Sequence, residues 1–491
     1  MNLNYTDDTI CAIATAQGGA IGTIRVSGKE AIQITEKIFS ASGAKLSERK
    51  PYTLTFGQIK SPDGEIIDEV LVSLFRAPHS YTGEDSTEIS CHGSSYILQQ
   101  VMQLLIQNGC RSALPGEFTQ RAFINGKMDL SQAEAVADVI ASTSAATHRL
   151  AMNQMRGGFS RELSSLREKL LHLTSLMELE LDFSDHEELE FADRSELQEI
   201  ASQIHSVISR LVNSFSLGNA IKNGIPVAII GETNAGKSTL LNTLLNEEKA
   251  IVSDIHGTTR DVIEDTMNIN GTVFRFIDTA GIRETNDEIE SMGIERSFLK
   301  LDQADIVLWV IDSTNINASQ HFESLREKIL PHCTGKKLII VFNKSDLSNS
   351  NAFADDNATT NVADVTGAIS HTANISEFIQ NIHAKGHDII SISAKNKIGI
   401  AELQTKLIEA AALPEISQND VVVTNIRHYE ALSKALESIQ RVEDGMAMNL
   451  SGDFISQDLR ECLFHLAEIV GGEITTDEVL GNIFKNFCIG K

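Results

Sequence analysis

The sequence contains few cysteines and prolines, a single tryptophan and no long apolar run. Its six cysteines include no CxxC pair, which argues against a structural zinc site. The longest apolar runs, such as residues 306–311, are far shorter than the roughly 20 residues that cross a bilayer. The first ten residues, "MNLNYTDDTI", are acidic and lack the apolar stretch of a secretory signal. We therefore expect a cytoplasmic protein that does not contact membranes, with its cysteines present as free thiols.

Positive charge is also scarce. The chain has 41 lysine and arginine residues against 67 aspartate and glutamate residues, which gives a formal net charge of −26. Such a charge disfavours nucleic-acid binding through a diffuse electrostatic attraction. Any contact with RNA therefore requires a local basic patch, a partner protein, or both. The length of 491 residues is sufficient for two to four domains.

The first 222 residues divide into two segments. Residues 1–118 consist of short β-branched runs broken by glycine and aspartate, which predicts a small α+β domain. In residues 119–222, apolar side chains recur at three- and four-residue steps, as at Leu130, Ala133 and Ala137. Proline is absent from this second segment, and the pattern therefore predicts long helices.

The rest of the chain predicts an insertion. In residues 223–412, apolar strands alternate with helix-length stretches, which is typical of a parallel, doubly wound sheet. The helical pattern returns in residues 413–491, where Arg427 and His428 are candidates for RNA contact. An α/β domain inserted into one helical domain explains this order. Residues 348–373 are weakly periodic and are expected to form a surface insertion.

A phosphate-binding motif lies between a predicted strand and a predicted helix. The stretch "GETNAGKST", residues 231–239, fits the pattern G-x-x-x-x-G-K-[ST]. Gly231 and Gly236 allow the backbone N–H groups to point at phosphate oxygens. Lys237 is expected to reach the β and γ phosphates, and Ser238 to offer its hydroxyl to Mg²⁺. The motif therefore predicts a nucleoside triphosphate site in a Ras-like G domain.

Three further motifs predict that the nucleotide is GTP. "DTAG", residues 278–281, is expected beside Mg²⁺ and the γ-phosphate. In "NKSD", residues 343–346, Asp346 can accept hydrogen bonds from the N1–H and amino groups of guanine, which adenine lacks there. "SAK", residues 393–395, supplies a backbone N–H to the guanine oxygen. The expected GTP contacts are Asn234, Ala235, Gly236, Lys237, Ser238, Thr239, Ser253, Asp254, Ile255, Gly257, Thr258, Thr259, Asp278, Thr279, Ala280, Gly281, Asn343, Lys344, Asp346, Ser393, Ala394 and Lys395.

The mechanism of hydrolysis is less evident from these motifs. In the loop "SDIHGTTRD", residues 253–261, a threonine is expected to complete the Mg²⁺ shell and to release it after hydrolysis. Thr259 is the candidate and Thr258 the alternative. Ile282 stands where Ras-like proteins place a water-orienting glutamine. Because an aliphatic side chain cannot hold a water, either hydrolysis is slow or another polar group substitutes.

Longer stretches resemble the MnmE (TrmE) family of tRNA-modifying GTPases along nearly the whole chain. They include "YTGEDSTEISCHG", "PGEFTQRAFINGKMDLSQAEAVADVI", "DIHGTTRD", "DTAGIRETNDEIESMGIERS" and the terminal "FCIGK". The resemblance implies a homodimeric, K⁺-activated GTPase whose G domains meet to hydrolyse GTP. With an MnmG-like partner that uses FAD and NADH, it would add a carboxymethylaminomethyl or aminomethyl group at C5 of the wobble uridine (position 34) of certain tRNAs. The alternative is a ribosome-associated or assembly GTPase that acts only as a regulatory switch.

The resemblance also implies roles for residues of the G domain. The K⁺ ligands would be Asn234, Ser253, Ile255 and Thr258, which leaves Thr259 for Mg²⁺ together with Ser238. A monovalent cation at the triphosphate can replace the charge of an arginine finger. The family's water-positioning glutamate corresponds to Glu290, which would be catalytic.

A folate site in the N-terminal domain follows from the same resemblance. This domain is expected to form the dimer and to bind 5-formyl- or methylene-tetrahydrofolate. A cation suits the glutamate tail of folate, and a carboxylate suits the donors of the pterin ring. The terminal "CIGK" is not a prenylation signal, because Gly490 and Lys491 break the required pattern. Cys488 is expected to be a reaction-centre thiol, although it could attack, donate a proton or merely pack. The matched folate ligands are Arg25, Glu88, Lys127 and Lys491.

Overall fold

The computed structural model describes most of the chain and divides it into two compact units. The first unit comprises residues 1–142, 148–213 and 418–491, and the second comprises 143–147 and 214–417. Among the described residues, no helix combines the length and the apolar character that crossing a membrane requires. The described residues are 8–16, 18–182, 194–232, 234–248, 265–277, 301–314, 327, 329–347, 387–412 and 420–472.

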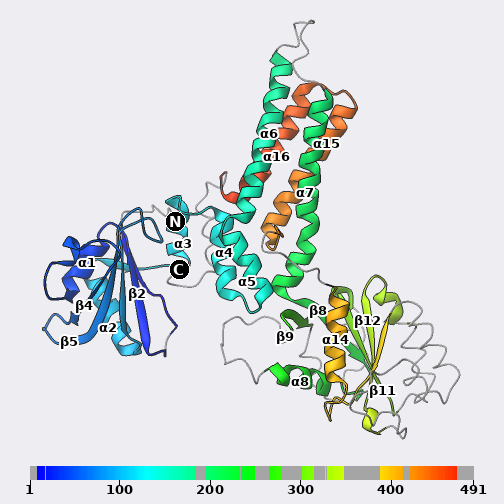
Figure 1. Cartoon of the computed structure of the whole chain (residues 1–491), viewed down its shortest axis with the longest axis horizontal. Coiled ribbons are helices and arrows are strands. Elements are labelled where there is room, and N and C mark those ends of the chain that lie inside the picture. Colours follow the sequence, from blue (N-terminus) through cyan, green and yellow to red (C-terminus); the bar gives the residue numbers. More distant parts are fainter. Residues whose placement is uncertain are drawn as a thin grey trace. The chain divides into compact units, whose positions relative to one another are not determined.

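The N-terminal part of the first unit is a sheet with helices packed on it (Figure 1). Within the described residues, seven strands pair in the order β3-β4-β5-β6-β2-β1-β7. All pairs are antiparallel except β1 with β7. This arrangement confirms the predicted α+β fold. The elements are β1 (Thr9–Ile13), β2 (Ile21–Ser27), α1 (Ala31–Ile38), β3 (Phe39–Ser40), β4 (Thr53–Lys60), β5 (Ile66–Phe75), β6 (Ser86–His92), α2 (Ser95–Gln107) and β7 (Cys110–Ser112).

The two faces of this sheet differ. Along β5, the buried residues Val70, Val72 and Leu74 alternate with more exposed ones, because successive strand residues point to opposite faces. The buried residues pack with apolar residues of α1 and α2 in one core. On the opposite face, Phe56 and Leu71 are direct cross-strand partners and remain exposed. This second face is therefore exposed at β4 and β5, whereas at β1 it is covered, because Ile10 and Ala12 pack with Phe118.

The helical part of the first unit joins two distant chain segments. Helix α16 contacts both α15 and α6, and side-chain contacts link α7 to α6 and α15, so the four helices run side by side (Figure 1). The N-terminal and C-terminal helical regions thus form one body with the α/β domain inserted between them, as predicted. The helices are α3 (Glu117–Ile124), α4 (Leu130–Ala141), α5 (Ala145–Met155), α6 (Gly158–Asp182), α7 (Arg194–Asn223), α15 (Ile426–Ala447) and α16 (Gly452–Val470).

The second unit contains a doubly wound sheet. Six described strands pair in the order β13-β12-β11-β8-β10-β9, and all neighbours are parallel except β10 with β9. One face packs on α8 and α14, and Trp309 and Phe342 belong to a second core on the other face. The elements are β8 (Ile225–Gly231), α8 (Lys237–Glu248), β9 (Asp265–Ile269), β10 (Thr272–Phe276), β11 (Ile306–Asp312), β12 (Lys337–Asn343), β13 (Asp388–Ser391) and α14 (Ile400–Ala411).

Strand β9 is absent from the sequence-based prediction. It is antiparallel to β10, and the turn between them holds Asn270 and Gly271, both with positive φ. Only Met267 and Ile269 of β9 are buried, so the strand does not present the continuous apolar run used to find the parallel strands. The Asn-Gly pair is a typical hairpin signal and could have revealed it.

Candidate nucleotide-binding site

The predicted phosphate loop connects the end of β8 to the start of α8. Gly231 has a φ of 149°, and a Cβ atom there would lie 2.1 Å from the carbonyl oxygen of Val310. Gly236 has a φ of 95°, and its Cβ would lie 2.2 Å from Nδ2 of Asn343. Both positions therefore require glycine, for conformation and for space. The loop approaches the neighbouring strands more closely than any side chain would permit.

Lys237 places its ammonium group over this loop. Its Nζ donates to the carbonyl oxygen of Gly231 at 2.8 Å and to that of Glu232 at 2.7 Å. Burial lowers the pKa of Lys237, and the negative charge of Glu232 opposes this effect. Because Lys237 is also the first residue of α8, its charge adds to the positive end of the helix dipole. A helix N-terminus with a lysine beside it suits the binding of phosphate.

Asn343 connects the three described nucleotide motifs. Its Nδ2 donates to the carbonyl oxygen of Ala235 at 2.9 Å, and its Oδ1 accepts from the backbone N–H of Ala394 at 3.0 Å. The side chain is 3% exposed. Ala394 is also bound through its carbonyl oxygen, which accepts from the hydroxyl of Thr243 on α8 at 3.0 Å. The loop that is expected to contact guanine is thus held from both directions.

The carboxylate that is predicted to specify guanine, that of Asp346, has a hydrogen-bond partner. The hydroxyl of Ser393 donates to Oδ1 of Asp346 at 2.6 Å, and Ser393 is buried whereas Asp346 is exposed. Lys344 has a positive φ, and its Nζ lies 2.6 Å from Oδ2 of Asp312. Burial favours a higher pKa for Asp312, but hydrogen bonds from Lys344 and Thr314 lower it below its ordinary value. Asp312 thus keeps a negative charge that orients Lys344.

Sequence reasoning missed Asp312 and Thr243. Asp312 ends the parallel strand β11, and the carboxyl edge of such a sheet is where ligands bind, which is a signal that could have identified it. Thr243 lies on a helix and pairs with a residue 151 positions away, so no local pattern indicates it.

Part of the predicted site lies outside the described residues. The structure describes the phosphate loop except residue 233, together with the NKSD and SAK motifs at the ends of β8, β12 and β13. The described site residues are Asn234, Ala235, Gly236, Lys237, Ser238, Thr239, Asn343, Lys344, Asp346, Ser393, Ala394 and Lys395. Outside the described residues lie Ser253, Asp254, Ile255, Gly257, Thr258, Thr259, Asp278, Thr279, Ala280, Gly281, Glu290, Cys488, Lys491 and the insertion at 348–373.

The predicted folate residues are arranged in the N-terminal domain as an ion pair and a separate lysine. Arg25 of β2 and Glu88 of β6 are cross-strand partners, and Nε of Arg25 donates to Oε1 of Glu88 at 2.9 Å. The guanidinium carbon of Arg25 lies 5.3 Å from the centre of the Tyr81 ring and 5.6 Å from that of Phe118. Lys127 donates to a carbonyl oxygen of the loop that precedes Tyr81. Sequence reasoning identified these charges but not their pairing.

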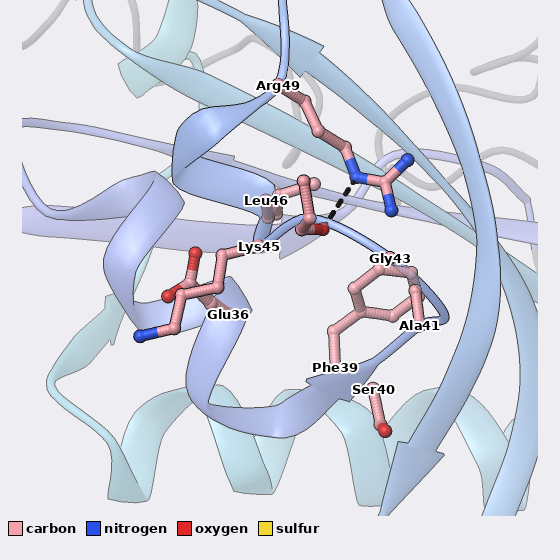
Figure 2. Close-up of a pocket in the computed structure, with 9 residues that line it drawn as sticks. Glu36, Phe39, Ser40, Ala41, Gly43, Lys45, Leu46 and Arg49 are labelled. Carbon is pink, nitrogen blue, oxygen red and sulfur yellow. Dashed lines mark hydrogen bonds between the residues drawn. The ribbon is translucent and has the colours of Figure 1, made fainter.

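A cavity in the same domain does not involve these residues. It has a volume of about 340 Å³ and is bordered by a loop that folds on itself, as Figure 2 shows. Arg49 donates to the carbonyl oxygens of Ala44 and Ser42, at 3.1 and 3.0 Å, and Glu36 accepts from Ser47. The lining residues are Glu36, Phe39, Ser40, Ala41, Gly43, Ala44, Lys45, Leu46 and Arg49.

The predicted RNA contacts at the start of α15 serve a different purpose. His428 is 1% exposed, and its Nε2 lies 2.7 Å from Oε2 of Glu134. Arg427 donates to Oε1 of Glu134 at 2.9 Å and to the carbonyl oxygens of Glu468 and Ile469. Both side chains connect α15 with α4 or α16, and His428 is too deeply buried to contact RNA. Contact of RNA with Arg427 stays a prediction.

The geometry of the second unit is that of a P-loop GTPase. A parallel sheet carries the phosphate loop, the aspartate predicted to specify guanine and a third predicted nucleotide loop at one edge. Two family profiles match the chain, the GTP-binding protein TrmE N-terminus over residues 9–127 and the MnmE helical domain over residues 130–488. The chain belongs to the MnmE family of tRNA modification GTPases.

Individual relatives agree with this family. A tRNA modification GTPase MnmE from Bacteroides fragilis is 67% identical over 486 residues, and one from Bacteroides thetaiotaomicron is 66% identical over 486 residues. One from Flavobacterium johnsoniae is 51% identical over 487 residues. Each of these three matches covers 99% of this chain and 99% of the relative. Among solved structures, Era from Aquifex aeolicus matches 43% of this chain and 66% of its own, with 28% identity and a TM-score of 0.28.

Proposed function

We propose that this GTPase is activated by K⁺ and that two G domains meet to hydrolyse GTP. The observation that carries the proposal is Asn234 in the phosphate loop. It has a φ of 65° and is exposed, and no hydrogen bond to its carboxamide is recorded within the described residues. A carboxamide oxygen at this place fits a monovalent cation beside the triphosphate, and that cation would supply the positive charge of an arginine finger.

The remaining ligands complete the proposed catalytic site. Ser253, Ile255 and Thr258 would share K⁺ with Asn234. Glu290 would orient the attacking water, since Ile282 offers no polar group where Ras-like proteins use glutamine. Mg²⁺ would be held by Ser238 and Thr259.

GTP turnover in potassium and in sodium tests this proposal. We expect the wild-type protein to hydrolyse GTP at least about tenfold faster in potassium, because the cation stabilises charge that develops in the transition state. Asn234→Ala should lose the stimulation and still bind GTP. Asn219→Ala, which removes an exposed amide outside the nucleotide motifs, is the matched control and should keep it. Equal turnover in both salts would contradict the proposal.

We further propose that the protein acts in the cytoplasm as a homodimer with an MnmG-like FAD- and NADH-dependent partner. Together they would add a carboxymethylaminomethyl or aminomethyl group at C5 of the wobble uridine of certain tRNAs. Tetrahydrofolate would supply the one-carbon unit, held by Arg25, Glu88, Lys127 and Lys491. The Arg25–Glu88 pair beside two aromatic rings fits such a ligand, because it combines a cation, a carboxylate and stacking surfaces.

Folate binding and the terminal cysteine separate this function from a regulatory switch. We expect 5-formyl-tetrahydrofolate to bind the wild-type protein, and Glu88→Gln to weaken that binding without changing GTP turnover. Cys488→Ser should reduce tRNA modification and leave GTP turnover intact. Modification by the Cys488→Ser variant at the wild-type level, together with no folate binding, would instead favour a switch without a part in the covalent chemistry.

A further inference from the structure

One stretch of the chain is basic, although the chain as a whole is acidic. Residues 139–161 contain three arginines and no aspartate or glutamate, although about one residue in seven of the whole chain is acidic. The three are Arg149, Arg156 and Arg161, and all are exposed. Since a net charge of −26 repels polyanions from most of the surface, a local cluster of this kind is where an RNA could approach.

Helix α5 presents two of these arginines on its outer side. The buried residues of α5 are Leu150, Ala151 and Gln154. Arg149 and Arg156 are seven residues apart, which is two helical turns, so they lie on the same side, away from the buried residues, and about 10 Å apart along the axis. The backbone N–H of Arg156 donates to the carbonyl oxygen of residue 152, so the helical geometry extends to it.

A tight glycine turn brings the third arginine to the end of α5. Gly157 has a φ of 76°, and a Cβ on Gly158 would lie 2.2 Å from Oδ1 of Asn153. The turn leads directly into α6 (Figure 1), where Nη1 of Arg161 donates to the carbonyl oxygen of Arg156 at 2.9 Å. This bond holds the guanidinium of Arg161 beside Arg156. We refer to Arg149, Arg156 and Arg161 as the arginine corner.

We propose that the arginine corner is the docking surface for the phosphate backbone of the RNA substrate. Guanidinium groups bind phosphate through two parallel hydrogen bonds, and the exposed Ser164 and Ser165 on the next turn of α6 add hydroxyl groups. The acidity of the rest of the chain restricts RNA to this surface, because like charges disfavour other approaches. The proposal rests on tRNA being the substrate, as in the family to which the chain belongs.

Asp420 is an acidic residue near the corner and offers a test in the opposite direction. Nδ2 of Asn153, on α5 between Arg149 and Arg156, donates to the backbone carbonyl of Asp420 at 3.0 Å. Because this bond places the backbone of Asp420 beside α5, the charge of its exposed carboxylate contributes to the electrostatic potential at the proposed docking surface. Asp420→Asn should therefore tighten RNA binding, by about threefold at low salt.

The main test removes the three charges together and measures RNA affinity. Arg149, Arg156 and Arg161 are replaced by glutamine, and binding of an unmodified tRNA transcript to the full-length protein is followed by fluorescence anisotropy over a range of salt concentrations. The matched control replaces Arg210, Lys434 and Arg441, which are exposed cations elsewhere on the same helical body, by glutamine. Both variants lose the same net charge. Urea denaturation followed by circular dichroism, which reports on the helical body, serves as the folding control.

We expect the corner variant to bind at least about tenfold more weakly and to lose roughly two to three units from the slope of log affinity against log salt. The control variant should change affinity by less than about threefold. An unchanged affinity and slope for the corner variant, an equal loss in the control variant, or no binding of RNA by the wild-type protein would overturn the proposal. Potassium stimulation and folate binding are measured without RNA, so failure here is distinguishable from failure of the proposed function.

Discussion

Glu134 carries a negative charge into the interior of the helical part of the first unit. Burial favours a higher pKa for this carboxyl group, but hydrogen bonds and positive charge from His428 and Arg427 lower it to about 2. The ring of Phe159, on α6, lies 5.1 Å from that of His428. Removing one member of such a group is costly, because the other buried charges then lack compensation.

Glu134→Gln tests how much the stability of the helical body depends on this buried carboxylate. We expect it to lower the free energy of unfolding of the helical body by about 3–5 kcal/mol. Urea denaturation monitored by circular dichroism measures this change. Glu162→Gln breaks the more exposed pair with Arg210 and should cost less than about 1 kcal/mol. Trp309, the single tryptophan, lies in the second unit, so its fluorescence should report an unchanged transition in both variants.

The same carboxyl group gives a pH dependence with a definite sign. Since the folded-state pKa of Glu134 lies below its ordinary value, its contribution to stability is complete at neutral pH. That contribution is lost as the pH falls from about 4.5 toward 2. The wild-type helical body should therefore lose more stability between pH 7 and pH 3 than Glu134→Gln does. Parallel pH profiles for the two proteins would show that the ion pair does not act in this way.

At the scale of an element, α8 connects the two ends of the nucleotide site. Its first residue, Lys237, lies at the phosphate loop, and Thr243 holds the carbonyl oxygen of Ala394. A movement of this helix would therefore reach both the phosphate and the guanine loops.

Thr243→Val removes this hydrogen bond and leaves the carbonyl oxygen of Ala394 buried without it. We expect the affinity for GDP to fall about tenfold, because an unsatisfied buried acceptor costs about 1–3 kcal/mol. Dissociation of a fluorescent GDP analogue measures the effect. Thr405→Val on α14 is the matched control, since its hydroxyl donates to a carbonyl oxygen of its own helix. Equal dissociation rates in the two variants would count against the role of α8.

The success of prediction also differs among elements. The strands β8, β11 and β12 were evident because their apolar runs are nearly continuous, as burial on both faces requires. The half-buried β9 was not evident.

The nucleotide motifs were predicted from spacing alone, whereas the pairing of Arg25 with Glu88 depends on the register between β2 and β6, which joins residues 63 positions apart. Such long-range register has no local signal in a single sequence.

At the scale of the whole molecule, the exposed apolar side chains of β4 and β5 support the proposed homodimer. Leu54 and Phe56 are 60% and 62% exposed, and Leu71, the cross-strand partner of Phe56, is 39% exposed. Apolar side chains grouped on one sheet face are typical of an interaction surface. A second copy of this chain is the partner that the proposed function requires.

Phe56→Asp places a charge in this face and should convert the dimer into a monomer. Molar mass measured by light scattering during size-exclusion chromatography detects the change. The control is Phe454→Asp, which alters a phenylalanine of similar exposure (63%) in α16 and should leave the dimer intact. A dimer that persists in Phe56→Asp at micromolar concentration would place the interface elsewhere.

The distance along the chain between Glu134 and Arg427 has a consequence for synthesis on the ribosome. These partners are 293 residues apart, which at 5–20 residues per second corresponds to about 15–60 s of translation. Helices α4 to α6 therefore leave the exit tunnel long before their charge-compensating partners exist. The nascent N-terminal and GTP-binding parts can fold in the meantime, and the helical body is completed last.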